Sequence, residues 1–151
     1  MRTKAVAAGL LALAAIVAQA EDAVTPAPAA SAPASAAAGC PSPQDVEPRQ
    51  LVGLWRAEFD GLAQGATLLL EPHREYAGSL SGEINRNGER AKVAADLDDG
   101  DFTLEESSDG LHIAATWLGD VVDGSCGNEI RGSWEPAGGA KRAFVMRRVD
   151  R

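Results

Sequence analysis

Residues 76–106 read YAGSLSGEINRNGERAKVAADLDDGDFTLEE, and this stretch decides the fold. Its apolar residues alternate with polar ones, and the dipeptides Asn87-Gly88 and Asp99-Gly100 interrupt the alternation. A period of two places successive side chains on opposite faces of a β-strand. Asn-Gly and Asp-Gly tolerate the positive φ of tight hairpin turns. The stretch therefore predicts three antiparallel strands joined by hairpins, each with one buried face.

The same pattern extends over most of the chain, with further turn signals at Asp60-Gly61, Asp109-Gly110 and Asp123-Gly124. No run keeps a period of 3.6 residues for three helical turns. The alternating runs are residues 51–59, 66–71, 76–84, 90–97, 101–106, 111–118, 128–135 and 142–148. We expect an all-β domain, an eight-stranded antiparallel up-and-down barrel, because closure leaves no exposed sheet edge. A two-sheet β-sandwich is the alternative.

The alternation also predicts the inward side chains, and aromatic rings are prominent among them. Each tryptophan has a small residue two positions before it on the same face, and this allows the large ring to lie across a neighbouring strand. The predicted inward residues include Trp55, Tyr76, Phe102, Leu111, Ile113, Trp117 and Trp134. These rings either pack a filled core or line a cavity. If a cavity exists, we expect Trp55, Trp117, Trp134 and Phe102 to contact its ligand.

The first twenty residues have the three-part organisation of a secretory signal peptide. Arg2 and Lys4 give a basic start, residues 5–17 are apolar, and Ala18-Gln19-Ala20 is a small-x-small cleavage site. The apolar run of about 13 residues is shorter than the roughly 20 that a membrane-spanning helix needs. We expect cleavage after Ala20, a periplasmic or secreted protein, and no stable membrane insertion afterwards. An uncleaved anchor is the alternative.

Residues 21–39, EDAVTPAPAASAPASAAAG, show no periodicity and almost no large apolar side chain. Such a segment buries too little surface to offset its ordering entropy, and its prolines favour extended conformations. We expect a disordered Pro/Ala-rich tether here, followed by a single domain over residues 40–151.

The chain is acidic, with a formal net charge of −8. An acidic domain repels phosphate backbones and anionic lipids, so nucleic acid is not an expected partner. The prevalence of Arg over Lys is typical of bacterial proteins with GC-rich genes. Several basic residues gather near the C-terminus, either as a last strand beside acidic neighbours or as a docking patch: Lys141, Arg142, Arg147, Arg148 and Arg151.

Cys40 and Cys126 are the two cysteines of the chain. An even count in an exported protein predicts a disulfide, which would join the start of the domain to the loop before the seventh strand. Ala38-Gly39-Cys40 also has the form of a lipidation motif. That motif requires its apolar stretch directly before the cysteine, whereas the apolar stretch here ends about twenty residues earlier.

Gly53-Leu54-Trp55 on the first strand and an Arg-rich last strand resemble the calycin superfamily, which includes lipocalins and avidin-like proteins. The resemblance implies a barrel with Trp55 at its floor, and Arg147 or Arg148 stacked over that ring. Lipocalins are longer and usually end in a helix, which this sequence lacks. The polar pattern by which avidin-like proteins hold biotin is also missing, so the resemblance implies a fold and no particular ligand.

Polar clusters that could carry chemistry are few. His73 lies between carboxylates in Glu71-Pro72-His73-Arg74-Glu75, which predicts a solvated turn more simply than a general base. Asp96, Asp98, Asp99 and Asp101 surround Gly100, but the spacing departs from that of an EF-hand, and calcium stays an open question. His112 has no thiolate or second histidine near it for zinc. We expect no metal and no cofactor.

The sequence thus predicts a non-catalytic binding module on a small β-barrel. Two kinds of partner are consistent with the pattern: a small apolar molecule in the interior, or another envelope protein that meets the surface of a filled barrel, for example as the target of an inhibitor. A hydrolytic enzyme is the third reading, but nucleophile motifs and phosphate-binding glycine loops are absent from the sequence.

Overall fold

The computed structural model describes residues 39–149, so the predicted signal peptide and nearly all of the tether lie outside the described residues. Two short 3-10 helices, η1 (Pro43–Asp45) and η2 (Pro48–Leu51), precede the strands. The strands are β1 (Gly53–Phe59), β2 (Ala66–Pro72), β3 (Leu80–Arg86), β4 (Glu89–Asp98), β5 (Asp101–Ser107), β6 (Ala115–Val121), β7 (Glu129–Pro136) and β8 (Arg142–Arg148). Within residues 39–149 no helix has the length and hydropathy of a membrane span.

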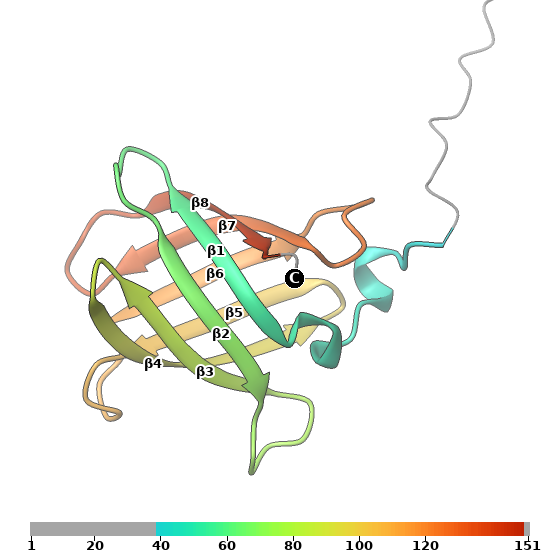
Figure 1. Cartoon of the computed structure of the whole chain (residues 1–151), viewed down its shortest axis with the longest axis horizontal. Coiled ribbons are helices and arrows are strands. Elements are labelled where there is room, and N and C mark those ends of the chain that lie inside the picture. Colours follow the sequence, from blue (N-terminus) through green and yellow to red (C-terminus); the bar gives the residue numbers. More distant parts are fainter. Residues whose placement is uncertain (1–38, 150–151) are drawn as a thin grey trace, which may run out of the picture. The chain divides into compact units, whose positions relative to one another are not determined.

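The eight strands form one closed barrel in sequence order, and every neighbouring pair is antiparallel (Figure 1). Pairing of β1 with β8 closes the sheet, with Trp55 opposite Arg148 and Phe59 opposite Phe144. The predicted up-and-down barrel is confirmed, and the alternative of two stacked sheets is wrong. Closure pairs both edges of every strand, which removes the free edges that a sandwich keeps.

Two hairpins have the turn chemistry that the sequence predicts. β3 and β4 are joined by Asn87-Gly88, with φ of 53° and 90°, and β4 and β5 by Asp99-Gly100, with φ of 50° and 91°. Positive φ at both central residues is the geometry of the type I′ turn, in which Asn, Asp and Gly are strongly preferred. These turns fix the register of the three central strands.

We call the two ends of the barrel the floor and the mouth. The floor is the end where β1 begins and β8 ends, beside η1 and η2; the mouth is formed by the β1–β2, β3–β4, β5–β6 and β7–β8 connections. The segment with η1 and η2 covers the floor: Pro43 lies against Gly100 of the β4–β5 turn, and Val46 lies against Gly127 of the β6–β7 loop. Leu51 of η2 is fully buried and closes the core from below.

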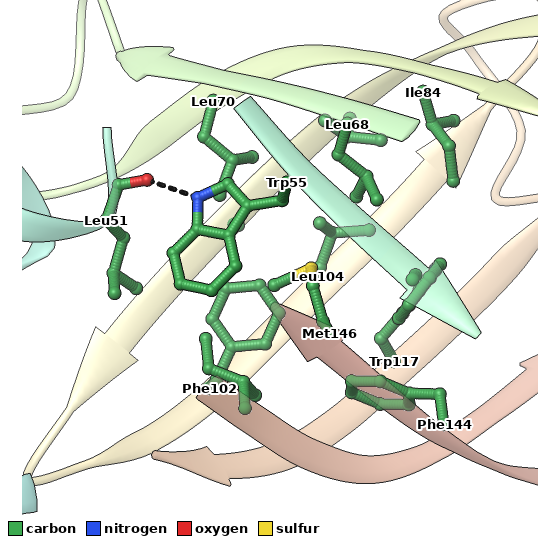
Figure 2. Packing of buried hydrophobic residues seen from close by; sticks show 14 of the residues in the cluster. Leu51, Trp55, Leu68, Leu70, Ile84, Phe102, Leu104, Trp117, Phe144 and Met146 are labelled. Atoms are coloured by element: carbon green, nitrogen blue, oxygen red, sulfur yellow. Dashed lines mark hydrogen bonds between the residues drawn. The ribbon is translucent and has the colours of Figure 1, made fainter. Parts of the chain in front are cut away.

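The interior near the floor and centre is filled by large side chains (Figure 2). Trp55, Trp117, Phe102 and Phe144 are each at most 2% exposed. The rings of Trp117 and Phe144 meet edge to face, with centroids 4.7 Å apart. Edge-to-face packing is a favourable arrangement for aromatic rings and adds to their area burial. The predicted inward alternation is therefore confirmed in this part of the barrel.

Two predicted strands are too long at their start. β3 begins at Leu80 rather than at residue 76, and β6 begins at Ala115 rather than at residue 111. The alternation predicts that Tyr76, Leu111 and Ile113 point inward, and this is wrong: they are 63%, 84% and 52% exposed. Side-chain acceptors bind the backbone of both segments. The His73 ring accepts hydrogen bonds from the amides of Glu75 and Tyr76. In the β5–β6 loop, Asp109 accepts hydrogen bonds from the amides of Leu111 and His112. Such local bonds compete with strand pairing.

The predicted disulfide between Cys40 and Cys126 is present, with their Cα atoms 4.7 Å apart. It ties the residue before η1 to the β6–β7 loop at the floor. Because the Cys40 sulfur is bonded to Cys126, it is not the lipid-bearing thiol that the alternative reading required.

Candidate ligand site at the mouth of the barrel

The four aromatic residues predicted to contact a ligand lie at different depths. Trp134 of β7 is nearest the mouth and is 7% exposed, whereas Trp55, Phe102 and Trp117 are fully buried. Phe59 connects two of them, because its ring lies 5.2 Å from Trp117 and 4.8 Å from Trp134. Trp134 is the predicted residue that a ligand entering from the mouth would meet first.

Trp55 belongs to the floor. Its indole nitrogen donates a hydrogen bond of 2.7 Å to the Leu51 carbonyl, and the guanidinium of Arg148 lies 5.2 Å from its ring centroid. Arg148 also donates to the carbonyl of Val52, at 2.9 Å. Of the two arginines that the resemblance offered as the cover of Trp55, Arg148 has this position. Arg147 points outward and pairs with Glu129 at 2.9 Å.

A buried carboxylate organises the barrel just below the mouth. Glu106 of β5 is 3% exposed and is the buried charged residue of the described chain. Its Oε1 accepts hydrogen bonds from the indole nitrogens of Trp117, at 2.7 Å, and Trp134, at 3.0 Å. The same oxygen accepts one from Arg86 Nη2, at 2.9 Å. A buried charge is tolerable when it is paired and hydrogen-bonded in this way.

Arg86 of β3 completes the cluster. Its guanidinium lies over two aromatic rings, 5.3 Å from the centroid of Phe59 and 4.9 Å from that of Trp134. Cations are attracted to the faces of aromatic rings, so both contacts help to hold the head group beside Phe59 and Trp134. The side chain of Arg86 is 27% exposed and that of Glu106 is 4% exposed. The charge that the cluster presents to solvent is therefore that of the arginine.

A small pocket of about 120 Å³ opens above this ion pair. Arg86, Glu106 and Trp134 line its polar side, and Ile84, Ala91, Ala115 and Pro136 are among its apolar walls. The residues come from β3, β4, β5, β6 and β7, so the pocket depends on the pairing and curvature of these five consecutive strands. Binding sites for whole small molecules usually measure about 300–1,000 Å³. This pocket therefore fits one end of a ligand rather than a large molecule.

Sequence reasoning missed Arg86 and Glu106, although their signal was present. Both extend an inward alternation by one step: Ile84 is followed by Arg86, and Phe102 and Leu104 are followed by Glu106. A charged residue at the end of an apolar face is ordinarily a solvent-exposed strand end. Only the register of β3, β4 and β5 shows that these two side chains meet inside.

The other polar candidates take part in local loop structure. His73 uses Nδ1 to accept the amides of Glu75 and Tyr76, and its ring packs against Tyr76 with centroids 4.7 Å apart. His112 lies in the β5–β6 loop, bonded to Asp109 at 2.7 Å, rather than on an outward strand position. Among residues 39–149, no group of three or more His, Cys, Asp and Glu side chains is arranged to hold a metal ion. The four aspartates near Gly100 therefore form no such group.

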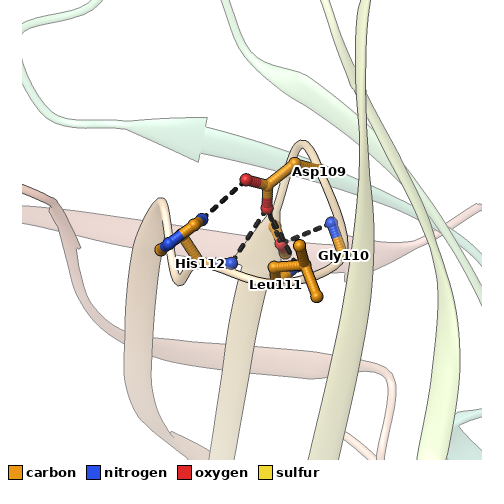
Figure 3. A network of polar contacts seen from close by, with 5 residues as sticks. Asp109, Gly110, Leu111 and His112 are labelled. Carbon is orange, nitrogen blue, oxygen red and sulfur yellow. Dashed lines mark hydrogen bonds and ion pairs between the residues drawn. The ribbon is translucent and has the colours of Figure 1, made fainter.

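The Asp109 carboxylate holds together the loop that rises beside the pocket (Figure 3). Its Oδ1 accepts the backbone N–H groups of Leu111, at 2.8 Å, and His112, at 2.9 Å, while Oδ2 meets the His112 ring. The His112 ring first, and then these backbone donors, hold the pKa of Asp109 well below its ordinary value. The loop is thus ordered although its side chains are exposed.

The barrel itself engages Lys141, Arg142, Arg147 and Arg148, whereas Arg151 of the predicted basic cluster lies outside the described residues. Arg147 pairs with Glu129, Lys141 lies 3.5 Å from Glu135, and Arg142 donates to the Asp60 carbonyl. Arg131 and Arg147 together lower the pKa of Glu129. These contacts favour the reading of a basic last strand beside acidic neighbours over that of a free docking patch.

Fold and site together define a class: a closed eight-stranded barrel with a filled floor and a buried Arg–Glu pair beneath a small mouth pocket. No protein-family model matches the chain, and the search of curated proteins gives no match.

Proposed function

We propose that this chain is an exported, non-catalytic binding protein that holds one end of a small ligand in the mouth pocket of a calycin-like barrel. One observation carries the proposal: the barrel is filled from its floor to the Arg86–Glu106 pair, and the pocket above that pair combines charged groups with Trp134 and apolar side chains. A concave site in which polar groups converge beside apolar walls can orient a small ligand.

Export is part of the proposal and rests on the N-terminal pattern, with cleavage after Ala20 into the periplasm or the medium. The Cys40–Cys126 disulfide supports it, because such bonds persist in oxidising compartments. The calycin kinship is supported by the closed topology and by Arg148 over the ring of Trp55. The absence of catalysis is supported by the two histidines, since half-buried His73 and exposed His112 are each used in the hydrogen bonds of their own loops.

The test is a titration of intrinsic tryptophan fluorescence with small neutral molecules, such as butan-1-ol and cyclohexanol. We expect a saturable change in the emission of the wild-type protein. Ala91→Leu should abolish it, because the added side chain enters the pocket from β4. Ala94→Leu is the matched control: it makes the same change three residues along the same strand, at an exposed position.

Ala94→Leu should keep the response. Circular dichroism of both variants establishes that the barrel is intact. If neither neutral molecules nor short-chain acids change the emission of the wild type, or if Ala91→Leu and Ala94→Leu respond alike, the mouth pocket is not the ligand site.

Recognition of another exported protein is a second candidate, favoured by the β5–β6 loop. Leu111 at its tip is 84% exposed and Ile113 is 52% exposed, on a loop already ordered by Asp109. Ordering before contact lowers the entropy cost of association. Pull-down from an extract of exported proteins should then lose its partner with Leu111→Asp, and keep it with Leu118→Asp on the wall of β6, where the leucine is 50% exposed.

A further inference from the structure

We infer that the mouth pocket recognises a carboxylate, which binds to the side of the Arg86 guanidinium that Glu106 leaves free. This inference rests on the proposed function and names the chemistry of the group that enters the pocket. It is carried by the donors and acceptors around Arg86, by the exposure of the two charged partners, and by the size of the pocket.

The donors of Arg86 exceed the acceptors around it. A guanidinium carries five N–H donors and no acceptor. Glu106 takes up only the end of the group, through Nη2 at 2.9 Å and Nη1 at 3.4 Å. The Nε atom is buried and has no hydrogen-bond partner. A buried donor without a partner is costly, so a group that supplies an acceptor on this side gains free energy beyond a simple surface contact.

The acceptors of the pocket are already committed or few. Glu106 Oε1 receives three donors, from Arg86, Trp117 and Trp134, and the carboxylate is almost fully buried. Arg90 on the rim is paired with Glu83, at 2.9 Å. Glu89 is the other carboxylate that lines the pocket, at its exposed edge. The groups of the site that lack a partner are therefore hydrogen-bond donors, and a ligand has to supply acceptors.

A carboxylate fits this capacity better than a neutral acceptor does. It is acceptor-only, and its two oxygens can accept from the guanidinium N–H groups that Glu106 leaves without a partner. The rings of Phe59 and Trp134 lie 5.3 Å and 4.9 Å from the guanidinium carbon, and together with Glu106 they restrict the position of this group before the ligand arrives. With about 120 Å³ available, the pocket takes the carboxylate and a short apolar stem beside Ala91 and Ala115.

Two sources share this chemistry: a free short-chain acid and the C-terminal carboxylate of a peptide. The experiment follows the three indole N–H signals in nitrogen–proton correlation spectra of the folded domain. Trp134 and Trp117 donate to Glu106 and report on the pocket, whereas Trp55 donates to Leu51 at the floor and is the internal reference. The probes are propionate, propionamide, N-acetylalanine and N-acetylalanine amide, with chloride as the ionic-strength control.

We expect propionate to shift the Trp134 and Trp117 signals saturably, with at least tenfold higher affinity than propionamide, and Trp55 to stay in place. N-acetylalanine separates the sources: binding as tight as that of propionate indicates a peptide C-terminus, and much weaker binding indicates a free acid. Arg86→Lys should weaken propionate at least tenfold, because a lysine keeps the charge but loses the planar pair of donors. Arg131→Lys, at an exposed position of β7 outside the pocket, should not.

Equal binding of propionate and propionamide would overturn the carboxylate inference and leave the proposed mouth site standing. A chloride effect equal to that of propionate would overturn it as well. If Arg86→Lys fails to fold, the comparison of acid with amide on the wild type still decides. Failure of every neutral and acidic probe to move Trp134 would remove both the inference and the proposed function.

Discussion

At the scale of single residues, the barrel depends on a few polar side chains that give backbone or indole donors a partner. Glu106 does this for two indoles in the interior, and Asp109 does it for two backbone amides in an exposed loop. The interior carboxylate shapes the pocket. The exposed carboxylate of Asp109 determines where β6 begins, because the amides of Leu111 and His112 donate hydrogen bonds to it instead of to a neighbouring strand.

Asp109→Asn should lower the melting temperature at pH 7, because the amide loses the charged contact with the His112 ring. The folded pKa of Asp109 lies below its unfolded value of about 3.9, so its stabilisation is fully present above pH 4 and is lost as the pH falls through the folded pKa. The difference in melting temperature between the two proteins should therefore shrink steadily below pH 4.

Thermal unfolding between pH 2 and pH 7, followed by circular dichroism, measures this dependence. Asp123→Asn, in the β6–β7 loop at the floor, is the control, since no side-chain hydrogen bond of the described residues involves Asp123. A difference that is constant from pH 7 to pH 2 would contradict the role given to Asp109.

At the scale of elements, the strands meet closely where glycines face each other. Gly119 of β6 lies opposite Gly132 of β7, and Gly132 lies opposite Phe144 of β8. A Cβ atom at Gly132 would come within 2.0 Å of the Leu118 carbonyl oxygen and 2.4 Å of the Gly119 Cα. The small residue two positions before Trp134 thus serves strand packing as well as the ring.

Gly132→Ala should lower the free energy of unfolding by about 1–3 kcal/mol, because β6 and β7 must move apart to admit the methyl group. Ser133→Ala is the control, since it changes the next residue on the opposite face of the same strand. Urea unfolding of both variants gives the comparison. A stability of Gly132→Ala equal to that of the wild type would mean that the two strands do not approach as described.

At the scale of the whole molecule, closure of the sheet and the covalent link at the floor act together. Pairing of β1 with β8 joins strands from the two ends of the domain, and the disulfide joins residues separated by 86 positions. Both constraints restrict the unfolded chain, since each closes a long loop. The disulfide lies at the floor of the barrel, whereas the pocket lies at the mouth.

The double variant Cys40→Ser/Cys126→Ser should still form the barrel, because every strand keeps both neighbours. The chain-entropy model predicts a loss of at most about 4–5 kcal/mol for a loop of this length. Urea unfolding without reductant measures the loss, and reduced wild-type protein is the control that should behave like the variant. A variant as stable as the oxidised wild type would show that the bond does not contribute to stability.

The predictions from sequence succeeded where a local pattern carries the information. The two-residue period placed Trp55, Trp117 and Phe102 inside, and Asn87-Gly88 marked a real hairpin. They failed at Leu111. This residue continues the alternating pattern of β6 in the sequence, but it is exposed, and its amide donates to Asp109 instead of to a neighbouring strand. Periodicity cannot show where pairing stops when a side chain offers the backbone other partners.

By itself, the sequence determined the eight alternating runs, the tight turns between the central strands and the pair of cysteines, because each of these is a local or a counting constraint. Only the tertiary structure decided that Arg86 and Glu106 meet beneath a pocket at the mouth. They are twenty positions apart on β3 and β5, and their contact depends on the register of β4 between those strands and on the curvature of the closed sheet. Neither the register nor the closure is a property of any single run.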